Sequence, residues 1–251
     1  MRTQQEPAIM INGLTAGYGR RTVLHGLTAR LPRSRMTVVV GPNGCGKSTL
    51  LGVFAQVIRP VSGSVERTNA QRPGFVMQRS AVSDTLPITV REAVAMGRWA
   101  HRGPWRRLSK HDWSVVDECM ARLDILDLAC RQLGSLSGGQ RQRALVAQGL
   151  AQESDLLLLD EPTAGLDLQA QRRISEALDD AKSRGVTVVQ ATHDLATAMR
   201  AEHCLLLGEG RLVAEGSPVT VLRPEILEQI WGLPALSLLI RSRSEALGHG
   251  R

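Results

Sequence analysis

Three short stretches of the chain consist mainly of apolar and β-branched residues and end at polar ones. They are residues 37–40, 156–159 and 187–191. Runs of this kind are typical of strands buried on both faces, as in a parallel sheet that helices cover on each side. The apolar stretch 50–58, which closely follows the first run, has the length and composition of a helix. The pattern therefore predicts an α/β fold with a mostly parallel sheet.

The N-terminal part of the chain has a different pattern, in which glycines interrupt short apolar segments. Residues 9–14 and 23–31 are predicted to be short strands, and they indicate a small antiparallel β-subdomain. Tyr18, the only tyrosine, stands between Gly17 and Gly19. Its flat ring could stack on an adenine base, or it could be a half-buried aromatic residue of a turn. The local sequence does not separate these two interpretations.

Apolar residues recur at helical spacing in the middle of the chain. Thr89, Ser109 and Ser137 each precede an acidic residue or a glutamine by three positions, which is the capping-box spacing of a helix start. We therefore expect an α-helical subdomain inserted into an α/β core. The expected divisions of a single domain 1–251 are a core of residues 1–86 and 154–231, the helical insertion 87–153 and a C-terminal tail 232–251.

The composition limits the classes of protein to which the chain can belong. Its 251 residues are 43% hydrophobic but only 3% aromatic, so the core is expected to be aliphatic. The formal net charge of +7 is spread along the chain without a long basic block, and no nucleic-acid partner is expected. The four cysteines show neither a Cys-x-x-Cys pair nor zinc-finger spacing, which predicts reduced thiols in a cytosolic protein.

Membrane-spanning and exported proteins are disfavoured as well. No apolar run approaches the length that crosses a bilayer, and residues 1–7 are too polar for a signal peptide. The protein is expected to be soluble, so that any role at a membrane requires a partner.

One basic stretch also contains tryptophans. Its basic residues are Arg98, Arg102, Arg106, Arg107 and Lys110. Aromatic and basic residues together could bind nucleic acid, but a solvated helix–loop face is favoured because the chain contains no recognised nucleic-acid module. His101 and His111 lack a carboxylate or cysteine at ligand spacing, which argues against a metal site.

The clearest candidate for chemistry follows the first buried run. Its nine residues are Gly41, Pro42, Asn43, Gly44, Cys45, Gly46, Lys47, Ser48 and Thr49. They match the P-loop pattern Gly-x-x-x-x-Gly-Lys-Ser between a strand and a helix. The glycines allow N–H groups to point inward at phosphate oxygens, and the helix start adds its positive dipole end. Lys47 can then reach the β- and γ-phosphates of a nucleotide, and the Ser48 hydroxyl can bind Mg²⁺.

Polar residues at the ends of other predicted strands complete this chemistry. Asp160 and Glu161 follow four leucines, at the edge where open α/β sheets bind ligands. Asp160 can hold Mg²⁺, and Glu161 can orient and deprotonate an attacking water. His193 could contact a γ-phosphate, although a structural role is the simpler interpretation of a lone histidine. Gln78 could offer its amide oxygen to Mg²⁺ or to water, but a strand-end glutamine is usually unremarkable.

A second glycine-rich segment begins the last helix of the insertion. It consists of Leu136, Ser137, Gly138, Gly139 and Gln140. Two glycines in the first turn leave N–H groups uncovered, so this helix start could accept an anion such as a terminal phosphate. An ordinary glycine-bearing helix start is the alternative.

Taken together and in this order, these motifs resemble the ATP-binding cassette (ABC) ATPase family over about residues 9–227. The resemblance implies a P-loop NTPase fold and ATP hydrolysis with Mg²⁺. It also implies that Tyr18 stacks on adenine, that Gln78 is the glutamine of the Q-loop, and that residues 164–167, ending at Asp167, form the D-loop. Glu161 would be the catalytic base and His193 the switch histidine. Cys45 departs from the small residue more usual at its position and could make the site sensitive to thiol reagents.

The resemblance further implies an ATP-dependent homodimer. Two chains would pair head to tail, so that each ATP lies between the P-loop of one chain and the signature residues of the other. Those signature residues are Ser137, Gly138, Gly139 and Gln140. ATP binding would close the dimer, and hydrolysis would reopen it.

Segments 77–80, 86–90 and 96–98 are similar to those of zinc and manganese import ATPases. This similarity implies import of zinc or manganese through a separate membrane permease fed by a periplasmic or surface solute-binding protein. The chain would be a peripheral protein on the cytoplasmic face of the membrane. Ferric-siderophore and cobalamin import ATPases are the close alternative, and an exporter subunit stays open. A soluble ABC ATPase acting on nucleic acid or ribosomes is less favoured, because the chain carries one cassette and no long coiled coil.

Overall fold

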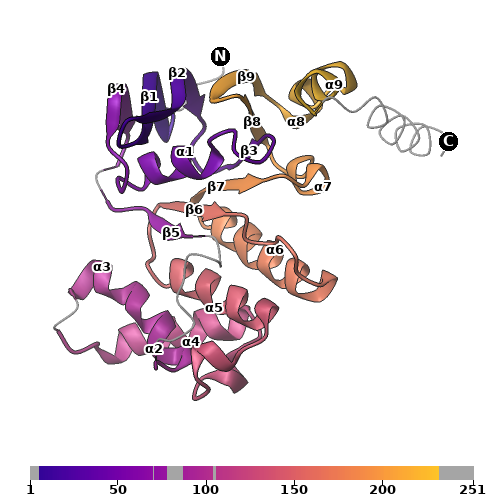
Figure 1. Cartoon of the computed structure of the whole chain (residues 1–251). Helices are drawn as coiled ribbons and strands as arrows, with labels where there is room; N and C mark the ends of the chain where they lie inside the picture. Colours follow the sequence, from indigo (N-terminus) through magenta and orange to yellow (C-terminus); the bar gives the residue numbers. More distant parts are fainter. Residues whose placement is uncertain (1–5, 70, 78–86, 104–105, 232–251) are drawn as a thin grey trace, which may run out of the picture.

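The computed structural model describes residues 6–69, 71–77, 87–103 and 106–231. Figure 1 shows two layers of strands in the upper half of the view and a group of helices in the lower half. No helix in these described ranges is both long and apolar enough to span a bilayer.

A six-stranded sheet forms the centre of the molecule, with the order β5-β6-β7-β3-β8-β9. Its strands are β3 (Met36–Val40), β5 (Gly74–Val76), β6 (Leu156–Asp160), β7 (Thr187–Thr192), β8 (His203–Gly208) and β9 (Arg211–Gly216). All neighbouring pairs are parallel except β8 and β9. Every residue of β3, β6 and β7 is buried, as their apolar runs predict. The predicted α/β fold with a mostly parallel sheet is confirmed.

A three-stranded antiparallel sheet, of order β2-β1-β4, lies beside the central sheet. Its strands are β1 (Ile9–Tyr18), β2 (Arg21–Leu31) and β4 (Pro60–Arg67). The two N-terminal strands are longer than predicted, because the β1 ladder continues past Gly13, which takes a positive φ of 58°, through shifts of register. The inner faces of β1 and β2 share one aliphatic cluster with helix α1 (Lys47–Phe54).

Helix α1 is shorter than predicted. The apolar pattern continues to Ile58, but the helix ends at Phe54 and Gln56 takes the left-handed conformation with φ of 61°. Gln56 is neither glycine nor proline, so the local sequence carries no strong stop signal at this position.

In its described residues, the stretch between β5 and β6 contains helices and connecting loops but no strand. The helices are α2 (Val90–Ala95), η2 (Met96–Arg98), α3 (Trp99–Arg102), α4 (Lys110–Arg122), η3 (Leu126–Leu128), η4 (Leu133–Ser135) and α5 (Gly138–Leu150). The capping boxes predicted at Thr89, Ser109 and Ser137 are all formed. Each satisfies two N–H groups that a helix start otherwise leaves without partners.

Up to residue 231, the last that the structure describes, four helices follow β6. They are α6 (Leu168–Ser183), α7 (Leu195–Ala198), α8 (Pro218–Val221) and α9 (Pro224–Trp231). Helix α6 packs between α5 and strand β7, and so connects the helical part of the molecule to the central sheet.

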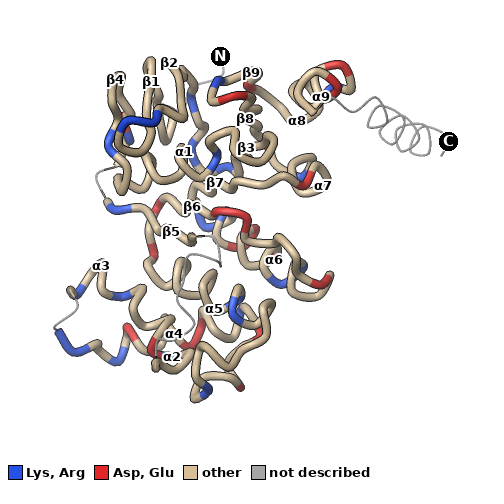
Figure 2. Tube along the Cα trace, viewed as in Figure 1, with Lys and Arg blue, Asp and Glu red and all other residues tan. Residues whose placement is uncertain are grey.

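The interpretation of the basic stretch as a solvated face is wrong for Arg98. This residue is only 4% exposed, and it donates to Asp112 Oδ1 (3.0 Å), the Ala151 carbonyl (2.8 Å) and Glu153 Oε2 (2.6 Å). The partners come from α4 and from the end of α5, so folding brings acids to a stretch that contains none. By contrast, Arg106, Arg107 and Lys110 are exposed. Figure 2 shows basic residues along the segment between α3 and α4.

Candidate functional site

Two glycines of the loop between β3 and α1 are required by its geometry. Gly46 takes φ of 105°, and a Cβ atom built on it would lie 2.5 Å from Leu24 Cδ2. A Cβ atom on Gly41 would lie 2.3 Å from the Leu207 carbonyl oxygen. The loop therefore passes too close to β2 and β8 for larger residues. Leu24 and Leu207 were not predicted to shape the loop, because nothing in the local sequence links them to it.

The start of α1 is suited to an anion. Gly46 is the N-cap and provides no side-chain hydrogen bond, and the first turn contains no acidic residue. The N–H groups of this turn can therefore donate to phosphate oxygens, and the helix dipole adds a favourable field.

Lys47 lies across the same loop. Its Nζ donates to the carbonyl oxygens of Gly41 (2.9 Å) and Pro42 (3.1 Å), and the residue is only 6% exposed. An ammonium group has three donors, so one remains for a phosphate oxygen without breaking either contact. The loop thus carries a fixed positive charge at its centre.

Asp160 meets the requirements of a Mg²⁺ ligand. It is 6% exposed, its Oδ1 has no hydrogen-bond partner within the described residues, and its side chain interacts with the Ser48 hydroxyl. Burial raises the pKa of this carboxyl, which the Ser48 hydroxyl and Lys47 partly offset. A buried carboxylate oxygen beside a hydroxyl is a donor set that Mg²⁺ prefers. Held by Ser48 and Asp160, Mg²⁺ would neutralise charge on the phosphates of ATP.

Glu161 and His193 meet at the carboxyl edge of β6 and β7. The two side chains are joined by a contact of 3.1 Å between Glu161 Oε1 and His193 Nδ1. Glu161 has φ of 49°, uncommon for a residue with a side chain, and its N–H donates to the Ala191 carbonyl (3.0 Å). Both residues line a cavity of about 150 Å³ together with Thr163, Gly165 and Asp194. A carboxylate fixed beside a small cavity can accept a proton from a water there.

The glycine-rich start of α5 is built differently from that of α1. Ser137 Oγ accepts from the Gln140 N–H (3.3 Å), and Gln140 Oε1 accepts from the Ser137 N–H (3.0 Å). A Cβ atom on Gly139 would lie 3.8 Å from Asp167 Oδ2, so this helix start adjoins the start of α6. Asp167 itself caps α6 by accepting from the Ala170 N–H (2.8 Å).

The structure therefore divides the predicted residues into two groups. The loop 41–49, Asp160, Glu161 and His193 lie at the carboxyl edge of the central sheet, whereas Ser137 to Gln140 and Asp167 lie at the starts of α5 and α6 (Figure 1). Gln78 lies outside the described residues.

Tyr18 lies at the end of β1, in a hairpin next to the loop. It pairs with Arg21 in the ladder and is 56% exposed, which is more than a half-buried turn residue would be. A Cβ atom on Gly46 would also contact Val23, so the start of β2 lies against the loop. The ring of Tyr18 is therefore accessible to a base near the phosphate loop.

Cys45 does not open towards solvent. It is 4% exposed, it belongs to the apolar cluster under α1, and burial raises the pKa of its thiol, with Lys47 acting in the opposite direction. The expectation that Cys45 makes the site sensitive to thiol reagents is therefore not supported by its surroundings. Within the described residues no group of three or more His, Cys, Asp or Glu side chains could hold a metal ion.

The chain is similar to known proteins over most of its length. Residues 24–164 match the family model for the ABC transporter. The ferric enterobactin transport ATP-binding protein FepC of Escherichia coli (strain K12) is 40% identical over 88% of this chain and 85% of its own length. The manganese transport system ATP-binding protein MntB of Bacillus subtilis (strain 168) is 32% identical over 89% of this chain and 92% of its own.

A solved structure shares the fold at a similar level of identity. It is an ABC transporter of the metal-chelate type in an inward-facing conformation, with 34% identity, a TM-score of 0.81, and coverage of 91% of this chain and 90% of its own. The family model covers more than half of the chain, and FepC matches most of it. The chain belongs to the ABC transporter family, and it is an ATP-binding subunit with ATPase activity.

Proposed function

We propose that the chain is the ATP-hydrolysing subunit of an importer that carries iron bound to a siderophore. The observation that carries this proposal is the 40% identity to a ferric enterobactin transport protein over 88% of the chain. The solved transporter of metal-chelate type, at 34% identity, supports the same class of cargo. This order reverses the expectation from the local motifs, which placed zinc or manganese ahead of a chelate.

Import of manganese is the second candidate. It is favoured by the 32% identity to MntB, which covers nearly the whole of both chains. Zinc is supported only by the segments 77–80, 86–90 and 96–98, of which residues 78–80 and 86 lie outside the described ranges.

In the proposed cycle, ATP binds first to one chain. Tyr18 stacks on the adenine, the N–H groups of residues 41–49 hold the phosphates, and Lys47 contacts the β- and γ-phosphates. Ser48 and Asp160 would hold Mg²⁺, with Gln78 as a further ligand. The support for this assignment is the accessible ring of Tyr18, the buried ammonium of Lys47 and the unpartnered oxygen of Asp160.

Hydrolysis is assigned to Glu161 and His193. Glu161 takes the proton of the attacking water, while His193 holds the Glu161 carboxylate in place and reaches the γ-phosphate. The 3.1 Å contact between their side chains supports this pairing.

A second copy of the chain supplies the remaining contacts to ATP. The start of α5, with Ser137, Gly138, Gly139 and Gln140, belongs to a different part of the molecule from its own phosphate loop. Head-to-tail pairing of two chains places it over the ATP of the partner, with Asp167 of the D-loop at the same interface. The dimer docks on a permease at the cytoplasmic face of the membrane, and a solute-binding protein delivers the cargo from the other side.

Uptake of labelled iron tests the cargo. A host that lacks the chromosomal copy would be complemented with wild type, Glu161→Gln or Glu176→Gln, and supplied separately with a labelled ferric siderophore, manganese or zinc. Glu176 lies on the exposed surface of α6, where it pairs with Arg172 (2.8 Å), so it is a matched control for the loss of one carboxylate. We expect Glu161→Gln to lose siderophore-dependent uptake alone and Glu176→Gln to retain it. If Glu161→Gln lost manganese uptake alone, manganese import would replace siderophore import as the function. Unchanged uptake of all three would refute import of these metals.

A further inference from the structure

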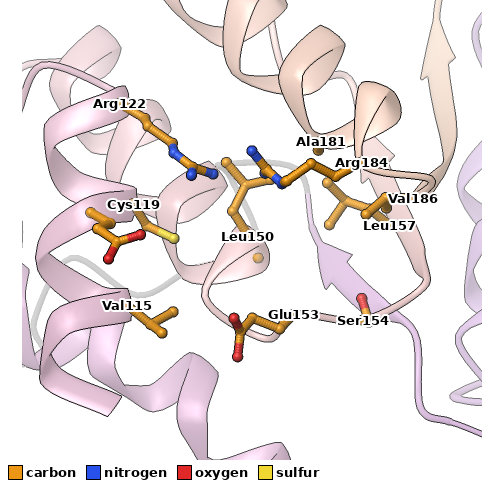
Figure 3. Close-up of a pocket in the computed structure, with 12 residues that line it drawn as sticks. Val115, Cys119, Arg122, Leu150, Glu153, Ser154, Leu157, Ala181, Arg184 and Val186 are labelled. Carbon is orange, nitrogen blue, oxygen red and sulfur yellow. The ribbon is translucent and has the colours of Figure 1, made fainter. Parts of the chain in front are cut away.

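A second cavity lies away from the nucleotide site, where the helical part of the molecule meets the sheet. Its volume is about 280 Å³. Helices α4 and α5 form one side, and β6, the end of α6 and the segment before β7 form the other (Figure 3). The cavity is therefore bounded by two parts of the structure that are distant in sequence.

The floor of this cavity is apolar. Val115, Leu157 and Ala181 line it and are buried, and Leu150 and Val186 complete the lining. Sites for small organic molecules combine such a lining with a few placed polar groups. The apolar part of a ligand could therefore pack against the floor. The polar groups at the rim then select the charge of the ligand.

Two arginines from different elements meet at the rim. Arg122 of α4 and Arg184, directly after α6, both contact the same oxygen of Asp180, with Arg122 Nη1 at 3.2 Å. Figure 3 shows their guanidinium groups near one another, above Leu150. Among the described residues, Asp180 is the only carboxylate within ion-pair distance of either arginine. Two positive charges thus share one negative charge, and further guanidinium N–H groups can donate to an anion.

The acidic residues of the lining are engaged within the protein. Glu153 accepts from buried Arg98 at 2.6 Å, and Glu118 accepts from Ser114 at 3.3 Å. Glu118 lies one helical turn before Arg122, so an anion at the arginines would meet its like charge as well as that of Asp180, which both arginines contact. An anionic ligand is therefore attracted by the arginine pair and opposed by Asp180 and Glu118.

We propose that this cavity binds a small organic anion with an apolar body, whose carboxylate or sulfonate is held jointly by Arg122 and Arg184. The body packs against Val115, Leu150 and Leu157. Because one arginine belongs to the helical part and the other follows α6 of the core, the bound anion links these two parts. The site is separate from the residues assigned to ATP and does not depend on the identity of the cargo.

Calorimetric titration of the full chain with 1-naphthalenesulfonate, without nucleotide, tests the proposal. This probe joins a compact apolar body to one anionic group. We expect saturable binding at one site per chain, and an affinity at least ten-fold lower in the double variant Arg122→Met/Arg184→Met. The matched control is Arg172→Met/Arg200→Met, which removes two arginines exposed by 81% and 66% that do not line the cavity. Wild-type affinity in the first double variant, or the same loss in the control, would overturn the proposal.

Two further arms test the chemistry of the ligand and guard against misfolding. Glu118→Gln removes the opposing charge and is expected to tighten binding by about three-fold, a gain that a poorly folded variant cannot produce. A weaker affinity in Glu118→Gln would indicate a cationic or zwitterionic ligand and overturn the proposal. Inorganic sulfate and neutral 1-naphthalenemethanol are each expected to bind at least ten-fold more weakly than the sulfonate. Equal affinity for either one would show that charge alone or apolar surface alone governs binding.

Discussion

His193 and Glu161 face one another across two neighbouring strand ends, with Nδ1 of the histidine 3.1 Å from Oε1 of the glutamate. Strands β6 and β7 are parallel and in register, and Asp160 lies opposite Ala191, so the residues that follow each strand come together. An ionised carboxylate can only accept a hydrogen bond, which means that Nδ1 carries the proton in this contact. The contact fixes the carboxylate that we assign to proton transfer.

Removal of this contact should affect turnover more than binding. In His193→Ala we expect kcat for ATP to fall about 100-fold, because the base loses its orientation, while KM changes less than three-fold. Phosphate release at a range of ATP concentrations measures both constants. His111→Ala, which removes an exposed histidine of α4, is the control and should behave as wild type. A rise in KM with unchanged kcat would instead assign His193 to ATP binding alone.

The apolar pattern was sufficient to locate the buried strands. Residues 156–160 form a fully buried strand, as a short unbroken run of leucines that ends in acidic residues predicts. The capping boxes could also be predicted from the sequence. In each, a serine or threonine and an acid or glutamine three residues later hydrogen-bond to each other's backbone N–H groups. These features depend on neighbours in the sequence, and the structure contains them as predicted.

Features that depend on distant residues could not be predicted in this way. The sequence predicts a solvated Arg98, because the basic stretch contains no acidic residue and no recognised nucleic-acid module, yet its partners Asp112 and Glu153 lie 14 and 55 positions away. Position 46 requires glycine because its φ is 105° and because Leu24 of β2 lies close to it. Helix α1 ends at Phe54 because Gln56, two residues later, takes the left-handed conformation, for which the sequence gives no strong signal. Only the packed fold brings such residues together.

Tyr18 provides a test of adenine stacking. Tyr18 is exposed, and in the stacking that we propose its ring would add contact area to bound ATP without touching the reacting phosphate. Tyr18→Ala should therefore raise KM about ten-fold and change kcat less than three-fold, and Tyr18→Trp should restore binding. Steady-state kinetics and fluorescence titration with an ATP analogue measure these effects. Equal affinity for ATP in wild type and Tyr18→Ala would show that Tyr18 does not stack on the adenine.

Arg98 should contribute more to stability than an exposed arginine does. Its replacement by methionine leaves the buried carboxylate of Asp112 with one arginine, Arg102 at 3.0 Å, and the hydrogen bonds from Ser109. We expect the free energy of unfolding to fall by about 3 kcal/mol, because a buried charge loses one of its partners. Arg172→Met breaks an exposed pair that solvent screens, and it should lower the free energy of unfolding far less. Urea denaturation monitored by circular dichroism compares the two variants, and similar values would show that the buried pair adds nothing.

Asp112 makes the stability of the helical part sensitive to acid. The Ser109 hydroxyl holds the pKa of this carboxyl well below its ordinary value of 3.8; burial opposes the effect, while the Ser109 N–H, Arg98 and Arg102 reinforce it. Because the pKa of Asp112 is lower in the folded state, the unfolded chain is protonated at this carboxyl first as the pH falls. The stability that ionised Asp112 confers is therefore lost as pH falls from about 4 towards the folded pKa. Asp112→Asn should be less stable at neutral pH but lose less stability than wild type between about pH 4 and pH 2. Parallel urea curves at each pH measure the difference, and identical pH profiles would contradict the assignment.

The cysteines should differ sharply in their reaction with iodoacetamide. Cys130 is exposed, whereas Cys45, Cys119 and Cys204 are buried. Burial raises the pKa of Cys119 to about 11 from an ordinary 9.0, which lowers its thiolate fraction at pH 8 about 100-fold, and burial raises that of Cys204 to about 12. Mass spectrometry of the folded protein should therefore find Cys130 modified first, with ATPase activity retained. The variant Cys130→Ser should take up almost no reagent until denaturant is added. Rapid modification of Cys45 with loss of activity would show that the phosphate loop opens in solution far enough to expose its thiol.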